Sequence, residues 1–355
     1  MNIDKFEIQD YIKNETIIPL YLVGDVLDVI SNLPSNSVDC CITSPPYWGQ
    51  RSYENGGIGL EAKSSEFIQN LLSITNEIYR VLKPTGSFWL NIGDTYQNKS
   101  LIGIPWRVAL NMTDEQGWTL RNSIIWNKHK GGMDSTTDRL RNVHENIFHF
   151  VKSSKGYYYN DIAIRSNPRL TTIKNGVVVS ATGVSGVSYK RKIELSTSLS
   201  AEEKKNALLG LEVVLNRIRL GEITDFRMII RDFHRATHSD KEEVSGRAKE
   251  LKEKGFYFLF YNPNGTLPSD VWDIIPEDTQ KREKHYAPFP EDLCKIPILA
   301  TCPENGVVLD PFCGTGTTNS VAFNLNRKSI GIDISETYLE IAAQRNKQLK
   351  FALAE

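Results

Sequence analysis

The sequence predicts an α/β protein whose mostly parallel sheet carries helices on both faces. Short apolar runs alternate with stretches of helical apolar spacing towards both ends of the chain. Near the C-terminus, the strand Val307–Asp310 leads through a glycine turn into a helix and then into the strand Ser329–Ile332. In a strand–helix–strand unit, the helix carries the chain back to the end of the sheet at which the first strand began. These two strands are therefore expected to be parallel. A cap at Ser335 predicts a final helix that extends through Gln348.

The first part of the chain supplies further elements of the same kind. A short N-terminal helix or arm and a helical turn over Leu27–Leu33 lead to a buried strand at Val38–Ile42. Apolar residues then recur at helical spacing from Phe67 to Leu82, where Lys-Pro-Thr-Gly follows and ends the helix. A second helix is expected from Pro105, because proline suits a first helical turn. The remaining strands are expected at Ser87–Ile92, Ser123–Trp126 and Asn146–Val151.

Residues 160–262 depart from this alternation and are expected to form an inserted, smaller domain. Residues 1–159 and 263–355 then make up the main domain. Within the insert, Ser200–Glu203 and Ser239–Glu242 match capping boxes and predict two helix starts, and 256–261 reads as a strand. From Arg121 to Lys192 there are thirteen Lys and Arg against four Asp and Glu, although the whole chain has a net charge of −1. This local excess of positive charge favours a contact with a phosphate backbone. A basic surface that is only solvated is the alternative.

The overall composition excludes several classes of protein. With 40% hydrophobic and 24% charged residues, the chain resembles an ordinary globular protein. No apolar run approaches the length of a membrane helix, and the first ten residues lack the layout of a signal peptide. The five cysteines show no CxxC or Cys/His spacing. We therefore expect reduced, buried thiols in a cytoplasmic protein that uses no metal and no membrane.

A first candidate site follows the buried strand Val38–Ile42, where the sequence reads Thr43-Ser-Pro-Pro-Tyr-Trp48. Two consecutive prolines fix two backbone angles and leave carbonyl groups without local N–H donors. Ligands of open α/β sheets bind at the carboxyl ends of the strands, which is where this turn would lie. An ordinary strand-ending turn is the alternative.

A second candidate site is the turn Asp310-Pro-Phe-Cys-Gly-Thr-Gly-Thr-Thr318. Its glycines allow a ligand to approach the backbone at a helix N-terminus, and Asp333 ends the next strand, where an acid can accept both hydroxyls of a ribose. Asn319 stands where a dinucleotide fingerprint has its third glycine. Asp310 would repel a pyrophosphate but suits a cation, such as the sulfonium and amino group of S-adenosylmethionine. A turn without a ligand is the alternative.

Together, the two motifs resemble the signature motifs of amino-group DNA methyltransferases. Their order, with the catalytic motif first and the cofactor motif last, is similar to the β class of that family. The resemblance covers about 1–155 and 265–355. It implies a Rossmann-like, S-adenosylmethionine-dependent methyltransferase whose mostly parallel sheet has one antiparallel strand. It also implies that the insert at 160–262 is a target-recognition domain.

The resemblance also implies roles for single residues. At the catalytic motif, Ser44 and the Pro45 carbonyl would hydrogen-bond the amino group of a flipped base, beside Pro46, while Tyr47 stacks on its ring. The methionine end of the cofactor would be surrounded by the second motif. That group consists of Asp310, Phe312, Gly314, Gly316, Thr317 and Thr318. Asp333 would hold the ribose and Asp25 the adenine amine. The stretch with His285, Pro288 and Phe289 would cover the methionine carboxylate.

The chemistry of such a reaction explains the need for these groups. An exocyclic amine is a poor nucleophile because its lone pair is delocalised into the ring, and two acceptors off the ring plane would localise it. Base–aromatic stacking, worth about 1–3 kcal/mol, offsets part of the cost of flipping the base. A covalent route would need a thiol at the base, whereas Cys313 lies in the cofactor turn and is expected only to pack.

In the family that the motif resembles, a serine at this position usually accompanies cytosine N4, so the resemblance implies cytosine N4 as the methylated atom, with adenine N6 as the alternative. Two other interpretations are methylation of RNA or a protein glutamine, and a DNA-binding subunit without catalysis. The expected partner is double-stranded DNA, with a cognate restriction endonuclease as a further candidate and a monomer or homodimer as the assembly. Candidate DNA contacts are Arg165, Arg169, Lys190, Arg191 and Lys192 in the insert, and Trp126, Lys128, Arg139 and Arg141 outside it.

Overall fold

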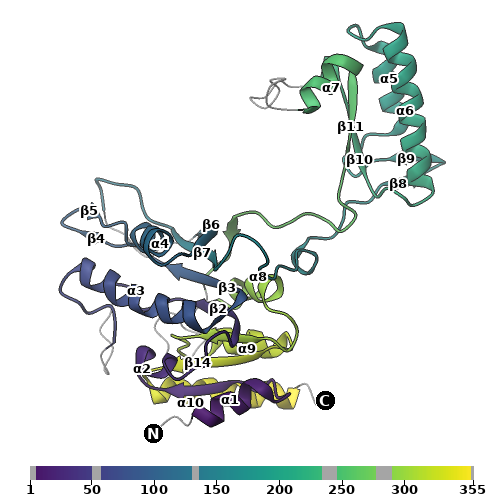
Figure 1. Ribbon diagram of the computed structural model, residues 1–355. Helices are drawn as coiled ribbons and strands as arrows, with labels where there is room; N and C mark the ends of the chain where they lie inside the picture. The colour runs from purple at the N-terminus through teal and green to yellow at the C-terminus, as the bar shows by residue number, and fades with distance from the viewer. Residues whose placement is uncertain (1–4, 50–56, 130–135, 234–245, 277–289, 353–355) are drawn as a thin grey trace. The chain divides into compact units, whose positions relative to one another are not determined.

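The computed structural model describes residues 5–49, 57–129, 136–233, 246–276 and 290–352. The chain divides into two compact units, which Figure 1 shows as ribbons. The sheet unit consists of Met1–Ile164 and Ser269–Glu355, and the inserted unit consists of Arg165–Pro268. The identification of the insert as a target-recognition domain stays a prediction.

The sheet unit is built on one eight-stranded sheet with the order β1-β14-β13-β2-β3-β7-β6-β12. Within it, β7 runs antiparallel to both of its neighbours, β3 and β6, and the other neighbouring pairs are parallel. This confirms the expected α/β fold with one antiparallel strand. The strands are β1 (Leu20–Val23), β2 (Val38–Thr43), β3 (Leu82–Ile92), β6 (Thr119–Asn127), β7 (His144–Val151), β12 (Val271–Asp273), β13 (Val307–Asp310) and β14 (Lys328–Asp333).

Helices cover both faces of this sheet because successive strand residues point to opposite sides. In β2, Cys41 joins one apolar core, whereas Cys40 and Ile42 join the other. The first core is closed by α1 (Lys5–Lys13), α2 (Val26–Ile30), α3 (Ser64–Val81) and α4 (Ile104–Glu115), and the second by α8 (Asp292–Thr301) and α9 (Thr317–Asn324). The last helix, α10 (Glu336–Ala352), packs on β1, β14 and α9. Strands buried on both faces explain the continuous apolar runs of the sequence.

One strand begins earlier than the sequence indicated. The helix α3 ends at Val81 and β3 starts directly at Leu82, eleven residues long, instead of at Ser87. Leu82 already pairs with Val38, and the next paired residue of β3 is Ser87, opposite Cys40. The four residues between them bulge out of the ladder, so the proline there removes no hydrogen bond with β2.

The inserted unit packs two helices against short strands. Apolar side chains of α5 (Gly186–Leu195) and α6 (Ala201–Arg219) form one core with β9 (Val177–Val179), β10 (Phe226–Ile230) and β11 (Phe256–Phe260). The strand β8 (Thr172–Lys174) pairs with β9 across Asn175-Gly176, both with positive φ, which is the backbone of a two-residue hairpin turn. The hairpin and α5 were not expected, although Asn-Gly is a strong turn signal.

The predicted start of α6 is confirmed. Ser200 accepts from the backbone N–H of Glu203, and the Glu203 carboxylate accepts from that of Ser200, as in a complete capping box. The second predicted box, Ser239–Glu242, lies outside the described residues, and α7 is described from Gly246 to Lys254.

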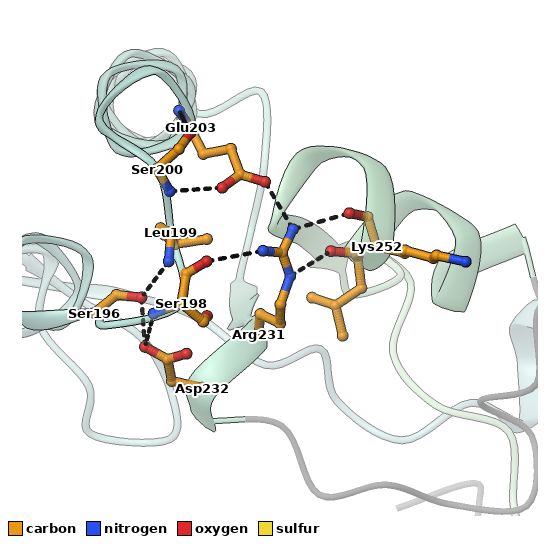
Figure 2. Close-up of polar contacts among 9 residues, drawn as sticks. Ser196, Ser198, Leu199, Ser200, Glu203, Arg231, Asp232 and Lys252 are labelled. Carbon is orange, nitrogen blue, oxygen red and sulfur yellow. Dashed lines mark hydrogen bonds and ion pairs between the residues drawn. The ribbon is translucent and has the colours of Figure 1, made fainter.

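A polar cluster joins three segments of the inserted unit (Figure 2). Arg231 lies in the 3-10 turn after β10 and donates to Glu203 Oε1 at 2.7 Å, to Ser198 O and to the Lys252 carbonyl, each at 2.9 Å. Next to it, Asp232 accepts from the Ser196 hydroxyl and from the backbone of the α5–α6 turn, and these hydrogen bonds lower the pKa of Asp232 to about 2. The cluster therefore ties β10, the α5–α6 turn and the C-terminal end of α7 together.

Candidate active site

The two predicted motifs meet at one edge of the sheet. Thr43 ends β2 and Asp310 ends β13, and these strands are parallel neighbours, with Leu309 opposite Cys41. The carboxyl ends of both strands therefore lie side by side. Parallel pairing thus brings together two turns whose first residues lie 267 positions apart in the sequence.

Asp310 connects the two turns through its carboxylate. Its Oδ1 accepts from Thr43 Oγ1 at 2.7 Å and from the Phe312 N–H at 3.2 Å, and its Oδ2 accepts from Thr318 Oγ1 at 2.6 Å. The residue is 5% exposed. Burial raises the pKa of this carboxyl from 3.8 to about 6, although the Thr318 and Thr43 hydroxyls oppose the shift. Asp310 is thus a buried acid whose ionised form is less favourable than that of an exposed aspartate, and a nearby cation would stabilise that form.

A second acid stands at the end of the next strand, β14. Asp333 Oδ2 accepts from the Gly314 N–H at 2.9 Å, and its Oδ1 accepts from the Ser335 N–H at the same distance. Burial raises the pKa of Asp333 as well. Its carbonyl accepts from the Gly24 N–H, next to Asp25, whose side chain caps α2 at Leu27. Both predicted acids, Asp333 and Asp25, therefore lie at adjoining strand ends, of β14 and β1.

The glycines of the second motif are required by the backbone. Gly314 and Gly316 have φ of 51° and 74°, in the left-handed region that glycine adopts without strain. A Cβ on Gly316 would also lie 2.7 Å from Ala342 Cβ and 2.8 Å from Tyr21 Oη. Directly after it, Thr317 begins α9 and its hydroxyl accepts from Arg345 at 3.3 Å. The motif thus folds into a tight turn that ends at a helix N-terminus.

At the first motif, a polar network surrounds the serine and tyrosine. Tyr47 Oη donates to Glu145 Oε2 at 2.6 Å and lies 3.2 Å from Ser44 Oγ. Asn91 Nδ2 lies within 3.1 Å of Ser44 Oγ, Tyr47 Oη and Glu145 Oε2. Lys128 pairs with the other oxygen, Glu145 Oε1. Side chains from β3, β7 and the end of β6 therefore converge on the turn.

The tyrosine ring has a fixed place beside the end of β3. A Cβ on Gly93 would lie 2.6 Å from Cε2 of Tyr47, so the ring packs directly on the glycine backbone. Burial and the neighbouring Glu145 carboxylate raise the pKa of the Tyr47 hydroxyl well above its ordinary value. The hydroxyl therefore stays protonated at neutral pH and remains a donor.

Sequence reasoning missed Asn91 as a member of this site and gave Glu145 no role. Asn91 is 2% exposed and lies in a strand that reads as plain apolar sequence, which hides a polar residue near its end. Glu145 lies at the second position of β7 and is 9% exposed. A charged residue at the start of a buried strand is itself a signal of function, and this signal could have identified Glu145.

Four further residues were predicted to lie near the cofactor or the DNA. His285, Pro288 and Phe289 lie outside the described residues. Trp126 is 4% exposed and belongs to a core, where its indole N–H donates to Ile274 O. The position of Trp126 therefore favours packing over a place on the DNA-facing surface.

The cysteines behave as packing residues. All five are free and buried, and burial raises the pKa of each thiol above its ordinary value. Protonated thiols are weak nucleophiles, so Cys313 is unsuited to covalent catalysis. Within the described ranges, no group of three His, Cys, Asp or Glu residues could hold a metal ion, and no helix has the length and apolarity to cross a membrane.

Comparison with known sequences places this site in context. A family described as DNA methylase matches residues 38–344. The chain is 31% identical over 378 residues to the Type II methyltransferase M.SfiI of Streptomyces fimbriatus, an alignment that covers 89% of this chain and 88% of that protein. It is 28% identical over 357 residues to the Type II methyltransferase M.SmaI of Serratia marcescens, which covers 91% and 89%.

Solved structures share the fold at lower identity. The PvuII DNA methyltransferase (cytosine-N4-specific) superposes with a TM-score of 0.55 at 17% identity, over 93% of this chain and 86% of that one. A putative DNA modification methylase from Thermus thermophilus gives a TM-score of 0.50 at 19% identity, over 93% and 95%. At these identities the likeness establishes the arrangement of helices and strands and nothing finer.

Proposed function

Because the chain belongs to the DNA methylase family of N4 and N6 amino-group methyltransferases, we propose that it methylates cytosine N4 in duplex DNA. The methyl group comes from S-adenosylmethionine and passes directly to the amine of a flipped base. The observation that carries the proposal is the Asp310 carboxylate, which bonds both to Thr43, beside the catalytic Ser44, and to Thr318 of the cofactor turn. One buried carboxylate thus sets the distance between the turn that would hold the methyl donor and the motif that would hold the target amine.

The residues at the sheet edge fit a cationic cofactor. Two acids with raised pKa values, Asp310 and Asp333, stand at neighbouring strand ends, and a nearby positive charge would favour the ionised form of each. When bound, S-adenosylmethionine supplies a methyl group on a sulfonium. Asp310, Phe312, Gly314, Gly316, Thr317 and Thr318 would hold its methionine end, Asp333 its ribose and Asp25 its adenine amine. His285, Pro288 and Phe289 would cover its carboxylate.

The acceptor side supplies the polarity that an aromatic amine needs. Ser44 Oγ and the Pro45 carbonyl accept from the amine hydrogens and favour a pyramidal nitrogen, whose lone pair then faces the methyl group. Pro46 stiffens the turn, and the Tyr47 ring offers its face to the base. After transfer the amine nitrogen carries a positive charge, and it gives up its extra proton to solvent water because the methylated, charged amine is a strong acid.

The serine at the head of the motif supports cytosine as the target, because the family that this motif resembles pairs a serine there with cytosine N4. Adenine N6 is the second candidate, since a neutral hydroxyl can accept from either amine. The Type II names of the relatives support a role in restriction–modification, with a cognate endonuclease as partner. We assign target recognition to the inserted unit, where Lys190 and Arg191 lie exposed on α5.

Mass spectrometry of digested DNA tests the reaction. The purified chain, incubated with isotope-labelled S-adenosylmethionine and duplex DNA of mixed sequence, should yield labelled N4-methylcytosine. If labelled N6-methyladenine were the only product, the target base would be adenine instead of cytosine, and the reaction would still be methylation of a DNA amino group. No labelled nucleoside, together with no calorimetric binding of S-adenosylmethionine, would support a non-catalytic DNA-binding protein.

Two substitutions test the division of roles. Tyr47→Ala should slow methyl transfer and leave the Kd for S-adenosylmethionine nearly unchanged, because Tyr47 faces the base. Asp333→Ala should raise that Kd and leave DNA binding intact. If both variants lost only cofactor affinity, the assignment of Tyr47 to the acceptor side would be wrong.

A further inference from the structure

Glu145 is a charged group bonded to the proposed acceptor motif, and no step of the reaction above uses it. A chain of hydrogen bonds leads from Ser44 Oγ to Tyr47 Oη at 3.2 Å and from there to Glu145 Oε2 at 2.6 Å. Glu145 is 9% exposed and lies at the start of β7, so its carboxylate reaches the site from a rigid strand. The direction of each bond in this chain determines what Ser44 can offer to a ligand.

The direction follows from counting hydrogens. An ionised carboxylate only accepts, and a tyrosine hydroxyl has one hydrogen, which is here given to Glu145. The hydrogen between Ser44 and Tyr47 must then belong to Ser44. The serine hydroxyl therefore donates towards Tyr47 and cannot point its hydrogen at the target amine.

The two lone pairs of the Ser44 hydroxyl oxygen can be counted in the same way. Asn91 Nδ2 has two hydrogens for three acceptors, Ser44 Oγ at 3.1 Å and Tyr47 Oη and Glu145 Oε2 at 2.9 Å, so it takes up at most one of the two lone pairs of Ser44 Oγ. Within the described part of the chain, no further hydrogen bond to Ser44 Oγ is seen. At least one lone pair is therefore left for a donor, and a donor is what an amino group presents.

We propose that Glu145 is a positioning residue that acts through Tyr47 to keep Ser44 an acceptor for the target amine. The inference rests on the proposed function, in which Ser44 holds that amine. Without a fixed acceptor at Glu145, the Tyr47 hydrogen could turn to Ser44, and the serine hydrogen would then be free to point at the amine. Donor would face donor, and the geometry that exposes the nitrogen lone pair would be lost.

Lys128 supports this role of Glu145. Its ammonium group pairs with Oε1, which leaves Oε2 for Tyr47 and Asn91, and it lies 4.8 Å from the centre of the Trp126 ring. The charged partner on Oε1 leaves Oε2 as an acceptor, because a carboxylate in an ion pair has no hydrogen to donate. Lys128 thus contacts the network around Ser44 through Glu145, and the Trp126 ring packs against Lys128.

A double-mutant cycle tests the proposal. Glu145→Gln keeps the size of the side chain but can present a donor to Tyr47, and Tyr47→Phe keeps the ring while it removes the link to Ser44. Each variant should slow single-turnover methyl transfer by about tenfold to a hundredfold at saturating DNA and cofactor. The double variant should be no slower than the slower single variant, because the second change acts on a chain that is already broken.

Glu77→Gln is the matched control, since Glu77 pairs with Arg80 on α3, away from the network around Ser44. It should retain the parental rate. A rate for Glu145→Gln within twofold of the parent would overturn the proposal. So would a full multiplicative loss in the double variant, which would indicate a general structural role. If the parent itself transferred no methyl group, the proposed function would fail before this test.

Discussion

Asp310→Asn should make the protein without cofactor more stable at neutral pH while it weakens cofactor binding. The carboxylate oxygens of Asp310 accept from two hydroxyls, of Thr43 and Thr318. An asparagine has nearly the same shape, and a threonine hydroxyl can accept as well as donate, so both contacts can survive the change. What disappears is the buried negative charge.

The magnitude follows from the pKa of Asp310. A rise from 3.8 to about 6 means that the folded protein holds this proton more tightly than the unfolded chain. The stability that the proton contributes is complete below pH 3.8 and is lost as the pH rises through 6. The total loss is on the order of 3 kcal/mol, of which about 1 kcal/mol falls between about pH 5 and pH 7. Asparagine does not titrate and escapes this loss.

Chemical denaturation at several pH values measures the effect. The advantage of Asp310→Asn over the parent should grow by about 1 kcal/mol from about pH 5 to pH 7. Calorimetry should show that the parental Kd for S-adenosylmethionine rises about tenfold for each pH unit below about 6, because a cation favours the ionised acid. In the variant, Asp310 no longer contributes to this dependence.

The control is Asp114→Asn, at an exposed position of α4. It should follow the parent in both measurements. If Asp310→Asn were less stable than the parent by the same amount at every pH, the buried charge would not be the cause. If its cofactor affinity matched that of the parent, Asp310 would not face the cationic end of the cofactor.

Three further predictions concern other contacts. Gly93→Ala should slow methyl transfer by up to about a hundredfold with unchanged cofactor Kd, because the new methyl group would displace the Tyr47 ring. Thr43→Val removes a donor that lowers the pKa of Asp310, so calorimetry should find cofactor affinity declining from a higher pH. Arg231→Met should destabilise the inserted unit by ~2 kcal/mol, seen as faster hydrogen exchange in α7 of the full chain.

Matched substitutions keep these results interpretable. Gly246→Ala adds a methyl group where no atom lies within 4 Å and should leave methyl transfer unchanged. Arg217→Met breaks the pair with Glu222, whose side chain is half exposed, and should change stability by well under about 1 kcal/mol. Unaltered exchange in Arg231→Met, or a pH profile of Thr43→Val that coincides with the parent, would contradict the respective prediction.

The sequence predicted the sheet well because apolar periodicity reports burial directly. Strands buried on both faces read as continuous apolar runs, and the glycine turn after Val307–Asp310 has few alternatives. The bulge at the start of β3 was missed, because pairing with β2 through Leu82 depends on a neighbour that local sequence does not reveal. The hairpin over Asn175-Gly176 is different, since its turn signal was present in the sequence.

The sequence carried a signal at Glu145 but did not reveal its partners around Ser44, and the reason lies in the one antiparallel strand. In a parallel sheet only the last residues of each strand reach the edge where ligands bind. Because β7 runs against β3, with Asn146 opposite Ile92, the first residues of β7 lie at that edge. Glu145 thereby stands beside Asn91 and the turn that holds Ser44 and Tyr47. The reversed strand thus delivers a charged residue from its beginning, which a parallel strand at the same place could supply only from its end.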